Sequence, residues 1–253
     1  MAFLEQELAN FEKLYLENKF ILHNCTTTYQ NIILSVKNNK ISLIKQGDNF
    51  LFLQNKPKIL TFFISNENKK YSIENCYLKL IIKHKEQIKR FDNFLKQNNF
   101  ELFKIFKAMH FSPKSDYENF DFIDFANINE VSEIYDFLTL FFDANWCFLY
   151  SKDDLVDKIT QNEILVDRYK DKISAILIFS KSFANISIDY IVAQSNNRKN
   201  SAYALMSKLI TINSQTKNFK LFVDENNIKA INFYTRFGFE FNDTKLLYYK
   251  NNF

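Results

Sequence analysis

Apolar positions follow two different spacings in the first half of the chain. Residues 2–20 carry apolar side chains at helical spacing and predict an amphipathic helix. Short runs rich in β-branched and aromatic residues come next, separated by polar turns, and predict a strand meander. These runs are residues 32–36, 41–45, 50–54 and 59–64. A further strand at 78–82, a helix at 86–98 and a strand at 102–111 complete this half.

Helical and strand patterns alternate in the second half, after a polar linker at 112–116. Strands are predicted at 120–125, 163–168, 173–179, 186–193, 219–223 and 246–250. Helices are predicted at 131–142, 152–160, 202–213 and 228–237. This order implies an α/β (α+β) fold, with a mixed sheet flanked by helices. We therefore expect a domain at 120–253, preceded by a smaller α+β N-terminal domain at 1–115.

Composition limits the classes of protein to consider. A hydrophobic content of 47% and a charged content of 25% are typical of a soluble globular protein. No apolar run is long enough to span a membrane, and the N-terminus does not resemble a secretory signal, so we expect a cytoplasmic protein without membrane contacts. The three cysteines are scattered, which argues against a metal site or a disulfide framework. The net charge of +4 is too small and too dispersed to favour nucleic-acid binding.

Glycine is rare, and an internal similarity is visible around one of its two occurrences. With so few glycines, we expect asparagine at turns that need a left-handed backbone. Residues 93–101 align with residues 232–240, so that Asn99 falls opposite Gly238 and Leu95 opposite Tyr234. Either this similarity is chance in a chain rich in Phe and Asn, or the N-terminal half is a degenerate copy of the second half.

Two segments of the second half carry candidate chemistry. In residues 188–206, a strand ends in a polar basic loop that opens a helix, where backbone amides and the helix dipole can bind a phosphate. By itself such a junction can equally be an ordinary loop. In residues 221–239, a strand is followed by Asn227 in the position of a helix N-cap and by a helix that ends at Gly238.

Together the two segments resemble the GNAT superfamily of N-acetyltransferases. That family has a loop of the form Arg/Gln-x-x-Gly-x-Gly/Ala after a strand that ends in Val. In the loop after Val192, Ala202 fits the last position and Asn200 replaces the usual Gly, whereas Asn197 departs from the usual Arg or Gln. The second motif matches the family at Val223, Asn227, Ala230, Tyr234, Gly238 and Phe239.

The resemblance implies a GNAT-type splayed sheet, with the pantetheine arm of acetyl-CoA between the strands that end near Val192 and Val223. The backbone of the first strand would pair with pantetheine, the amides of the loop would bind the pyrophosphate, and Asn227 would bind the pantetheine arm. The implied cofactor-binding residues are Ile191, Val192, Ala193, Asn197, Arg198, Lys199, Asn200, Ser201, Ala202, Asn227, Ala230 and Phe233.

The resemblance also implies an acid and leaves the base open. Tyr234 matches the family's general acid, which protonates the departing thiolate; otherwise it is a core aromatic residue. Asp189 is the nearest candidate base, with Asp224 and Glu225 as alternatives, and each can instead be a solvated carboxylate. The acceptor pocket would include Trp146 and Tyr190, although Trp146 can equally be ordinary core.

The expected activity is transfer of an acetyl group from acetyl-CoA, as co-substrate, to a primary amine of a small molecule or peptide by direct attack. The alternative is a non-catalytic acyl-CoA-binding or scaffolding protein that kept the fold. A nucleic-acid-associated protein is a third reading with little support in the charge pattern. We expect the N-terminal half to bind no CoA and to shape the acceptor site or mediate a homodimer.

Overall fold

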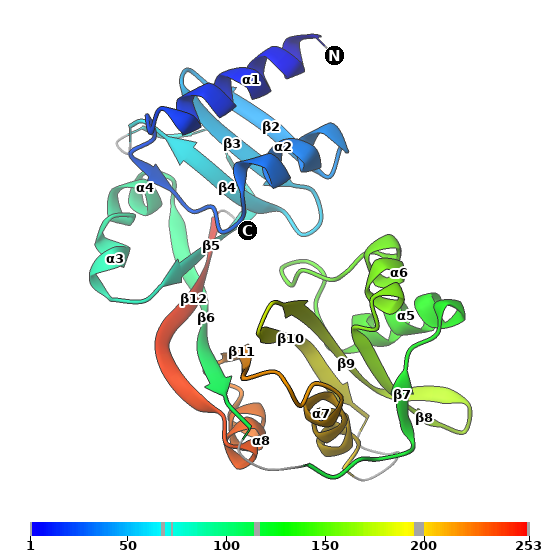
Figure 1. Ribbon diagram of the computed structural model, residues 1–253. Coiled ribbons are helices and arrows are strands. Elements are labelled where there is room, and N and C mark those ends of the chain that lie inside the picture. Colours follow the sequence, from blue (N-terminus) through cyan, green and yellow to red (C-terminus); the bar gives the residue numbers. More distant parts are fainter. Residues whose placement is uncertain (1, 67–68, 72, 114–116, 195–199, 252–253) are drawn as a thin grey trace. The chain divides into compact units, whose positions relative to one another are not determined.

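The computed structural model describes residues 2–66, 69–71, 73–113, 117–194 and 200–251, which form two compact units (Figure 1). Unit 1 comprises Met1–Phe106 and Asp243–Phe253, and unit 2 comprises Lys107–Asn242. Strands β6 (Phe100–Phe111) and β12 (Glu240–Asn251) therefore each contribute to both units. The sequence placed the boundary in the linker at 112–116, whereas the compact units divide inside these two long strands.

Unit 1 contains the meander expected from the sequence, with helices on both faces of its sheet. Its helices are α1 (Ala2–Leu16), α2 (Tyr29–Lys37), α3 (Glu86–Lys89) and α4 (Asp92–Gln97). Its own strands are β1 (Leu22–His23), β2 (Ile41–Gln46), β3 (Asn49–Gln54), β4 (Ile59–Ile64) and β5 (Cys76–Ile82). The strand order is β2-β3-β4-β5-β12-β6, and the meander β2-β3-β4 is antiparallel.

Alternation along β3 and β4 divides the core of unit 1 between the two faces of the sheet. Phe50, Phe52 and Phe63 pack around Phe11 of α1, with ring centroids 4.9–5.3 Å from it. Residues of the opposite face, such as Phe62, pack against α4 through Phe94, whose ring stacks at 4.0 Å. Both faces of the unit 1 sheet are therefore buried under helices.

One expected strand of unit 1 is a helix. The run at 32–36 was predicted as the first strand of the meander, but it lies in α2. Thr28 caps this helix by accepting a hydrogen bond from the Asn31 amide at 3.3 Å. Ile32 and Val36 are buried one helical turn apart. The prediction was wrong because a short β-branched run fits both periods, and the cap decides for the helix.

Unit 2 follows the order predicted from the sequence. Its helices are η1 (Ile128–Glu130, a 3-10 helix), α5 (Val131–Phe141), α6 (Lys152–Thr160), α7 (Ser201–Ile212) and α8 (Ile228–Phe237). Its own strands are β7 (Ile123–Phe125), β8 (Ile164–Tyr169), β9 (Lys172–Ser182), β10 (Asn185–Ala193) and β11 (Asn218–Asp224). The strand order is β6-β11-β10-β9-β8-β7. Within the described ranges, no helix of either unit is both long and apolar enough to cross a membrane.

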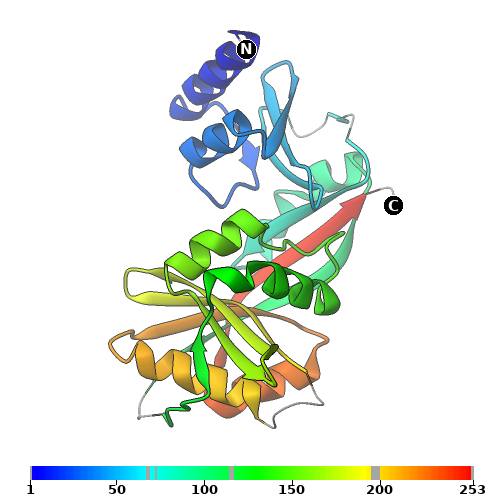
Figure 2. The ribbon, with the colours of Figure 1, turned by 90° about the vertical axis from the view of Figure 1, so that its right-hand side faces the viewer.

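The sheet of unit 2 is also covered on both faces. Figure 2 shows α5 and α6 on one side of this sheet and α7 and α8 on the other. Alternate residues of the central strands serve the two sides: Ile176 and Ile178 belong to the core under α5 and α6, and Leu177 and Phe179 to the core under α7 and α8. The mixed, helix-flanked fold predicted from the sequence is confirmed.

The internal similarity in the sequence corresponds to equivalent structure. In each unit, two helices precede three antiparallel strands, and the third strand pairs in parallel with the next strand along the chain. A helical segment and a long final strand follow. After α4 and α8, the chain turns through a left-handed residue, Asn99 with φ 54° or Gly238 with φ 95°. Phe100 and Phe239 are buried directly after these turns. The two units differ in one connection. Unit 2 has α7 between β10 and β11, whereas the described residues between β4 and β5 of unit 1 contain no helix.

Candidate active site

Strands β10 and β11 separate in the middle of the unit 2 sheet. They pair in parallel from Asn185–Asn218 to Ile188–Leu221, and this register then ends although both strands continue. On its other edge, β10 shifts register against β9 between Ile188 and Tyr190, which places Asp189 at a β-bulge. A bulge bends a strand and increases its twist, so it accounts for the separation. The splay implied by the family resemblance is present.

The edge of β10 beyond the bulge can accept an added strand. Ile191, Val192 and Ala193 pair with β9 on one edge, and β11 offers them no register on the other. All three are partly buried. Unpaired backbone N–H and C=O groups on such an edge form hydrogen bonds with an extended ligand in the way that they would with another strand. The site residues predicted on this strand therefore border the splay.

Helix α7 begins at Ser201 and is the next described element after β10. Asn200 is its N-cap and has a φ of 68°, the left-handed conformation expected of a residue that replaces Gly in the motif. Its side chain makes no capping hydrogen bond. The side chain of Asn200 therefore does not cap the amides of the first turn, which include those of Ser201 and Ala202. Such amides at a helix start are suited to binding an anion. The other predicted loop residues, Asn197, Arg198 and Lys199, lie outside the described residues.

Helix α8 follows β11 and begins at its predicted N-cap. The side-chain oxygen of Asn227 accepts a hydrogen bond from the Ala230 amide at 3.0 Å, which orients the Asn227 amide group. With the oxygen on the helix, the exposed –NH₂ group of Asn227 is left to donate outward. Ala230 and Phe233 are partly buried on the same helix and pack against the core beneath it.

Tyr234 is buried in unit 2, with 8% of its surface exposed. Its ring lies 5.6 Å from that of Phe239 and 5.4 Å from that of Phe233. Burial raises the pKa of the Tyr234 phenol above its ordinary value. The phenol therefore stays protonated at neutral pH and can act as a proton donor, while the ring also belongs to the core.

Asp189 lies in a polar network that the sequence did not reveal. Its Oδ2 accepts hydrogen bonds from the Tyr150 hydroxyl at 2.9 Å and from the Ser180 hydroxyl at 2.7 Å. The Lys158 ammonium lies 3.5 Å from the same oxygen and also pairs with Glu163 at 2.7 Å. Burial, and then the charge of Asp189, raise the pKa of Tyr150, so this phenol remains a donor. The network holds the Asp189 carboxylate in one orientation at the bulge.

The loop between α5 and α6 packs on β10 through aromatic residues. Tyr190 donates a hydrogen bond to the Phe148 carbonyl, and its ring lies 4.9 Å from that of Phe142 and 5.9 Å from that of Tyr150. Burial raises the pKa of Tyr190. Trp146 is half-buried on the same loop. The two residues predicted for the acceptor site thus lie on adjoining elements, with Asp189 beside Tyr190.

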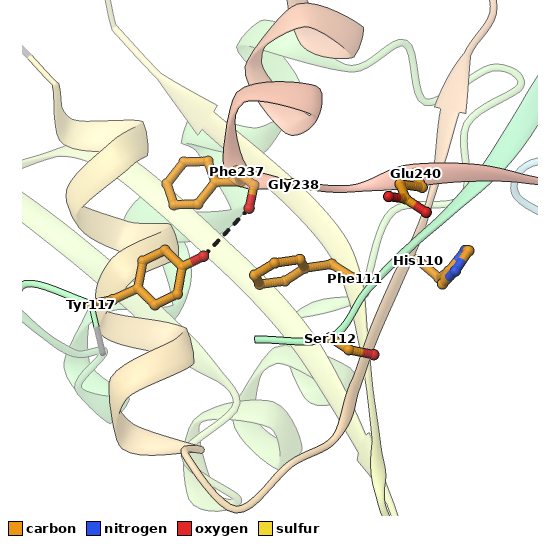
Figure 3. Close-up of a pocket in the computed structure, with 7 residues that line it drawn as sticks. All are labelled: His110, Phe111, Ser112, Tyr117, Phe237, Gly238 and Glu240. Atoms are coloured by element: carbon orange, nitrogen blue, oxygen red, sulfur yellow. Dashed lines mark hydrogen bonds between the residues drawn. The ribbon is translucent and has the colours of Figure 1, made fainter. Parts of the chain in front are cut away.

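A separate pocket of about 380 Å³ lies at the far end of α8 (Figure 3). It is lined by the end of β6, by Tyr117 and by the turn from α8 into β12, and the Tyr117 hydroxyl donates a hydrogen bond to the Phe237 carbonyl at 3.4 Å. His110 and Glu240 supply its polar edge. None of the residues predicted for the active site lines this pocket, although it includes Gly238 of the second motif. Among the described residues, no group of His, Cys, Asp and Glu could hold a metal ion.

In unit 1, the chain itself fills the position that corresponds to the splay. Strands β4 and β5 pair in parallel only at Ile59–Tyr77 and Leu60–Leu78. Beyond this point β1 pairs with β4 on the edge that faces β5, with Leu22 opposite Ile64. The Asn24 side chain then joins the two strands: it donates to the carbonyls of Leu60 (2.9 Å) and Lys79 (3.2 Å) and accepts from the Phe62 amide (2.8 Å). Backbone groups that border an open splay in unit 2 are satisfied internally in unit 1.

Solved structures share this fold over most of the chain. A GCN5-related N-acetyltransferase from Sphaerobacter thermophilus aligns with a TM-score of 0.57 and 10% identity, over 88% of this chain and 85% of that one. A tandem GNAT protein from the clavulanic acid biosynthesis pathway aligns with a TM-score of 0.53 and 7% identity, over 97% and 93%. A GCN5-related N-acetyltransferase from Kribbella flavida gives a TM-score of 0.52 and 8% identity, over 87% and 93%. These low identities establish the fold alone.

The sequence itself places the chain in a family. No curated protein matches it. The sequence model of the acetyltransferase (GNAT) family matches residues 101–239, which is more than half of the 253 residues and includes both motifs described above. The chain belongs to the acetyltransferase (GNAT) family.

Proposed function

We propose that this protein transfers an acetyl group from acetyl-CoA to a primary amine of a small molecule or peptide. The observation that supports this most directly is the edge of β10 beyond the bulge at Asp189, which pairs with no other strand among the described residues. It combines a strand edge suited to the amide-containing pantetheine arm with a helix start suited to a diphosphate. Family membership independently favours acyl transfer.

The residues around the splay have complementary binding roles in this proposal. The backbone of Ile191 to Ala193 pairs with the pantetheine amides, and the –NH₂ group of Asn227 donates to a pantetheine carbonyl. The amides at the start of α7 bind the diphosphate, and the sequence just before this helix contains the basic residues Arg198 and Lys199. Acetyl-CoA supplies the activated acyl group as a thioester.

The transfer needs one nucleophile, one acid and one base. The amine nitrogen attacks the acetyl carbonyl carbon, and the C–S bond then breaks. The Tyr234 phenol gives its proton to the departing sulfur, and the nitrogen loses its proton to a base. A backbone N–H near Val192 stabilises the negative charge that develops on the carbonyl oxygen. In this scheme the Tyr234 phenolate regains its proton from solvent after thiol release.

Asp189 is the base that the geometry favours. The bulge places it at the point where β10 leaves β11, and its donors hold the carboxylate in place. Glu163 shares Lys158 with Asp189, so the two carboxylates and one ammonium leave a net negative charge beside the aromatic loop. That charge attracts an ammonium acceptor before deprotonation. The half-buried Trp146 and the ring of Tyr190 would contact the acceptor's apolar part.

Thermal stability with and without acetyl-CoA tests the binding step. A ligand at about 100 times its Kd stabilises the native state by about 2.7 kcal/mol. For a chain of this size, that corresponds to an increase in Tm of roughly 5–10 °C. Thiol release in a screen of amines then tests the transfer. No shift with acetyl-CoA or with longer acyl-CoAs would remove the proposal.

A non-catalytic acyl-CoA-binding protein is the second candidate. The observation that favours it is the departure of Asn197 and Asn200 from the family loop. For such a protein, acetyl-CoA should raise the Tm by the same amount, but no amine should cause the release of thiol. Retention of Asn227 and of a protonated Tyr234 favours the catalytic reading.

A further inference from the structure

A buried carboxylate lies beneath the start of α7. Asp167 is on β8 and has no exposed surface. Its Oδ2 accepts a hydrogen bond from the Ser201 hydroxyl at 2.5 Å, and Ser201 is the first residue of α7. The main-chain carbonyl of Asp167 also accepts from the Ser174 hydroxyl at 3.2 Å. Gln194, the residue directly after β10, donates a hydrogen bond from its main-chain amide to the Ser174 carbonyl at 2.9 Å. Asp167 thus contacts the first residue of α7 through its side chain, and through its main chain it contacts Ser174, which in turn binds Gln194.

The surroundings of Asp167 make this carboxylate costly as a mere packing residue. The neighbouring strand positions Leu165 and Val166 are fully buried and apolar. A charge in such a place is tolerated only when strong partners compensate for its lost hydration. The short hydrogen bond from Ser201 is charge-assisted, and the positive end of the α7 dipole lies at the same point.

This contact anchors the start of α7 to β8, although it satisfies none of the helix's own N–H groups. Asn200 is in the N-cap position but makes no side-chain hydrogen bond to the first turn. The start of α7 is instead fixed from below through Ser201. Ser201 is buried, with 3% of its surface exposed, and its hydroxyl is hydrogen-bonded to Asp167 inside the protein.

We propose that Asp167 is a positioning residue for the diphosphate of the acyl donor, acting through Ser201 on the amides at the start of α7. This inference rests on the proposed function, since it assigns a role within the same site. Asp167 does not touch the ligand; it fixes the orientation of the amides that do. The consequence is specific: losing this contact weakens binding of ligands that carry a diphosphate and spares those that carry only the pantetheine arm.

Binding calorimetry with two ligands tests the proposal without knowledge of the acceptor. Acetyl-CoA carries the diphosphate and acetyl-pantetheine lacks it. In Asp167→Asn and in Ser201→Ala, we expect the Kd for acetyl-CoA to rise about tenfold, since one charge-assisted hydrogen bond is lost. The Kd for acetyl-pantetheine should stay within about twofold. The double variant should bind acetyl-CoA no more weakly than the weaker single variant, because both changes break one contact.

Matched controls separate positioning from general damage. Asp121→Asn removes an exposed carboxylate elsewhere in unit 2 and should leave both Kd values unchanged. If Asp167→Asn does not fold, Ser201→Ala still gives the comparison. An equal loss for both ligands, or unchanged or tighter binding of acetyl-CoA, would overturn the positioning role. If the unchanged protein binds neither ligand, the proposed function falls and this inference with it.

Discussion

Replacing Asn24 by Ala should destabilise unit 1 by removing the side chain that joins β4 to β5. The Asn24 amide nitrogen donates to the Leu60 carbonyl at 2.9 Å and to the Lys79 carbonyl at 3.2 Å. Its oxygen accepts from the Phe62 amide at 2.8 Å. One side chain therefore satisfies three backbone groups on two strands that have already separated.

The magnitude follows from these three hydrogen bonds. Each contributes a net free energy of about 1 kcal/mol, which gives an upper value of about 3 kcal/mol for Asn24→Ala. Asn24 is only partly buried, so water can replace part of the loss, and we expect about 2 kcal/mol. Asn24→Asp should cost at least as much at neutral pH, because its carboxylate would face the carbonyl oxygens of Leu60 and Lys79.

Urea unfolding followed by far-ultraviolet circular dichroism measures this loss. Asn129→Ala, at an exposed position of η1, is a matched control that should change the free energy of unfolding by less than about 0.5 kcal/mol. The single Trp146 lies in unit 2, so its fluorescence follows that unit separately. If Asn24→Ala and Asn129→Ala are equally stable, the Asn24 side chain does not hold the two strands together.

Three further changes test other parts of the account. Tyr234→Phe keeps the ring contacts and removes only the hydroxyl. We therefore expect kcat in the thiol-release assay to fall about 100-fold, with an unchanged Kd for acetyl-CoA. An unchanged kcat would exclude Tyr234 as the acid. Because burial raises the pKa of Tyr234, the rate should not decline as the pH rises through about 10, where an ordinary phenol ionises. Gly238→Ala should lower the free energy of unfolding by about 1–3 kcal/mol, since the residue has a φ of 95° and a new Cβ would lie 3.2 Å from the Phe111 ring; equal urea midpoints would contradict this. Asp189→Asn should lower kcat, because the carboxylate that takes the proton of the amine is lost, and a change in KM alone would argue for a binding role.

Local patterns in the sequence predicted much of unit 2. The polar loop after β10 and the Asn227 to Gly238 interval correspond to α7, α8 and their ends, because caps and left-handed turns depend on nearby residues. The conformation of Asn200 was also predictable, since few other residues tolerate its φ of 68°. The functional roles of these residues stay predictions.

Features that depend on distant parts of the chain could not be predicted. Residues 32–36 fit a strand as well as a helix, and the helix is stabilised by the Thr28 cap together with the packing of Ile32 and Val36 in a core that contains residues of α1 and β3. The network of Tyr150, Lys158 and Asp189 joins residues up to 39 positions apart that share no spacing pattern. The division of β6 and β12 between the units also has no local signal, although the alignment of Asn99 with Gly238 did predict equivalent left-handed turns before these two strands.

Hydrogen exchange with and without acetyl-CoA locates the binding site for the acyl donor on the chain. We expect acetyl-CoA to protect the backbone amides of Ile191 to Ala193 and of the first turn of α7, because these groups would pair with the ligand. We expect no added protection in β4 of unit 1, where β1 and Asn24 already occupy the corresponding edge. Protection centred on β4, or none in either unit at saturating acetyl-CoA, would contradict the account.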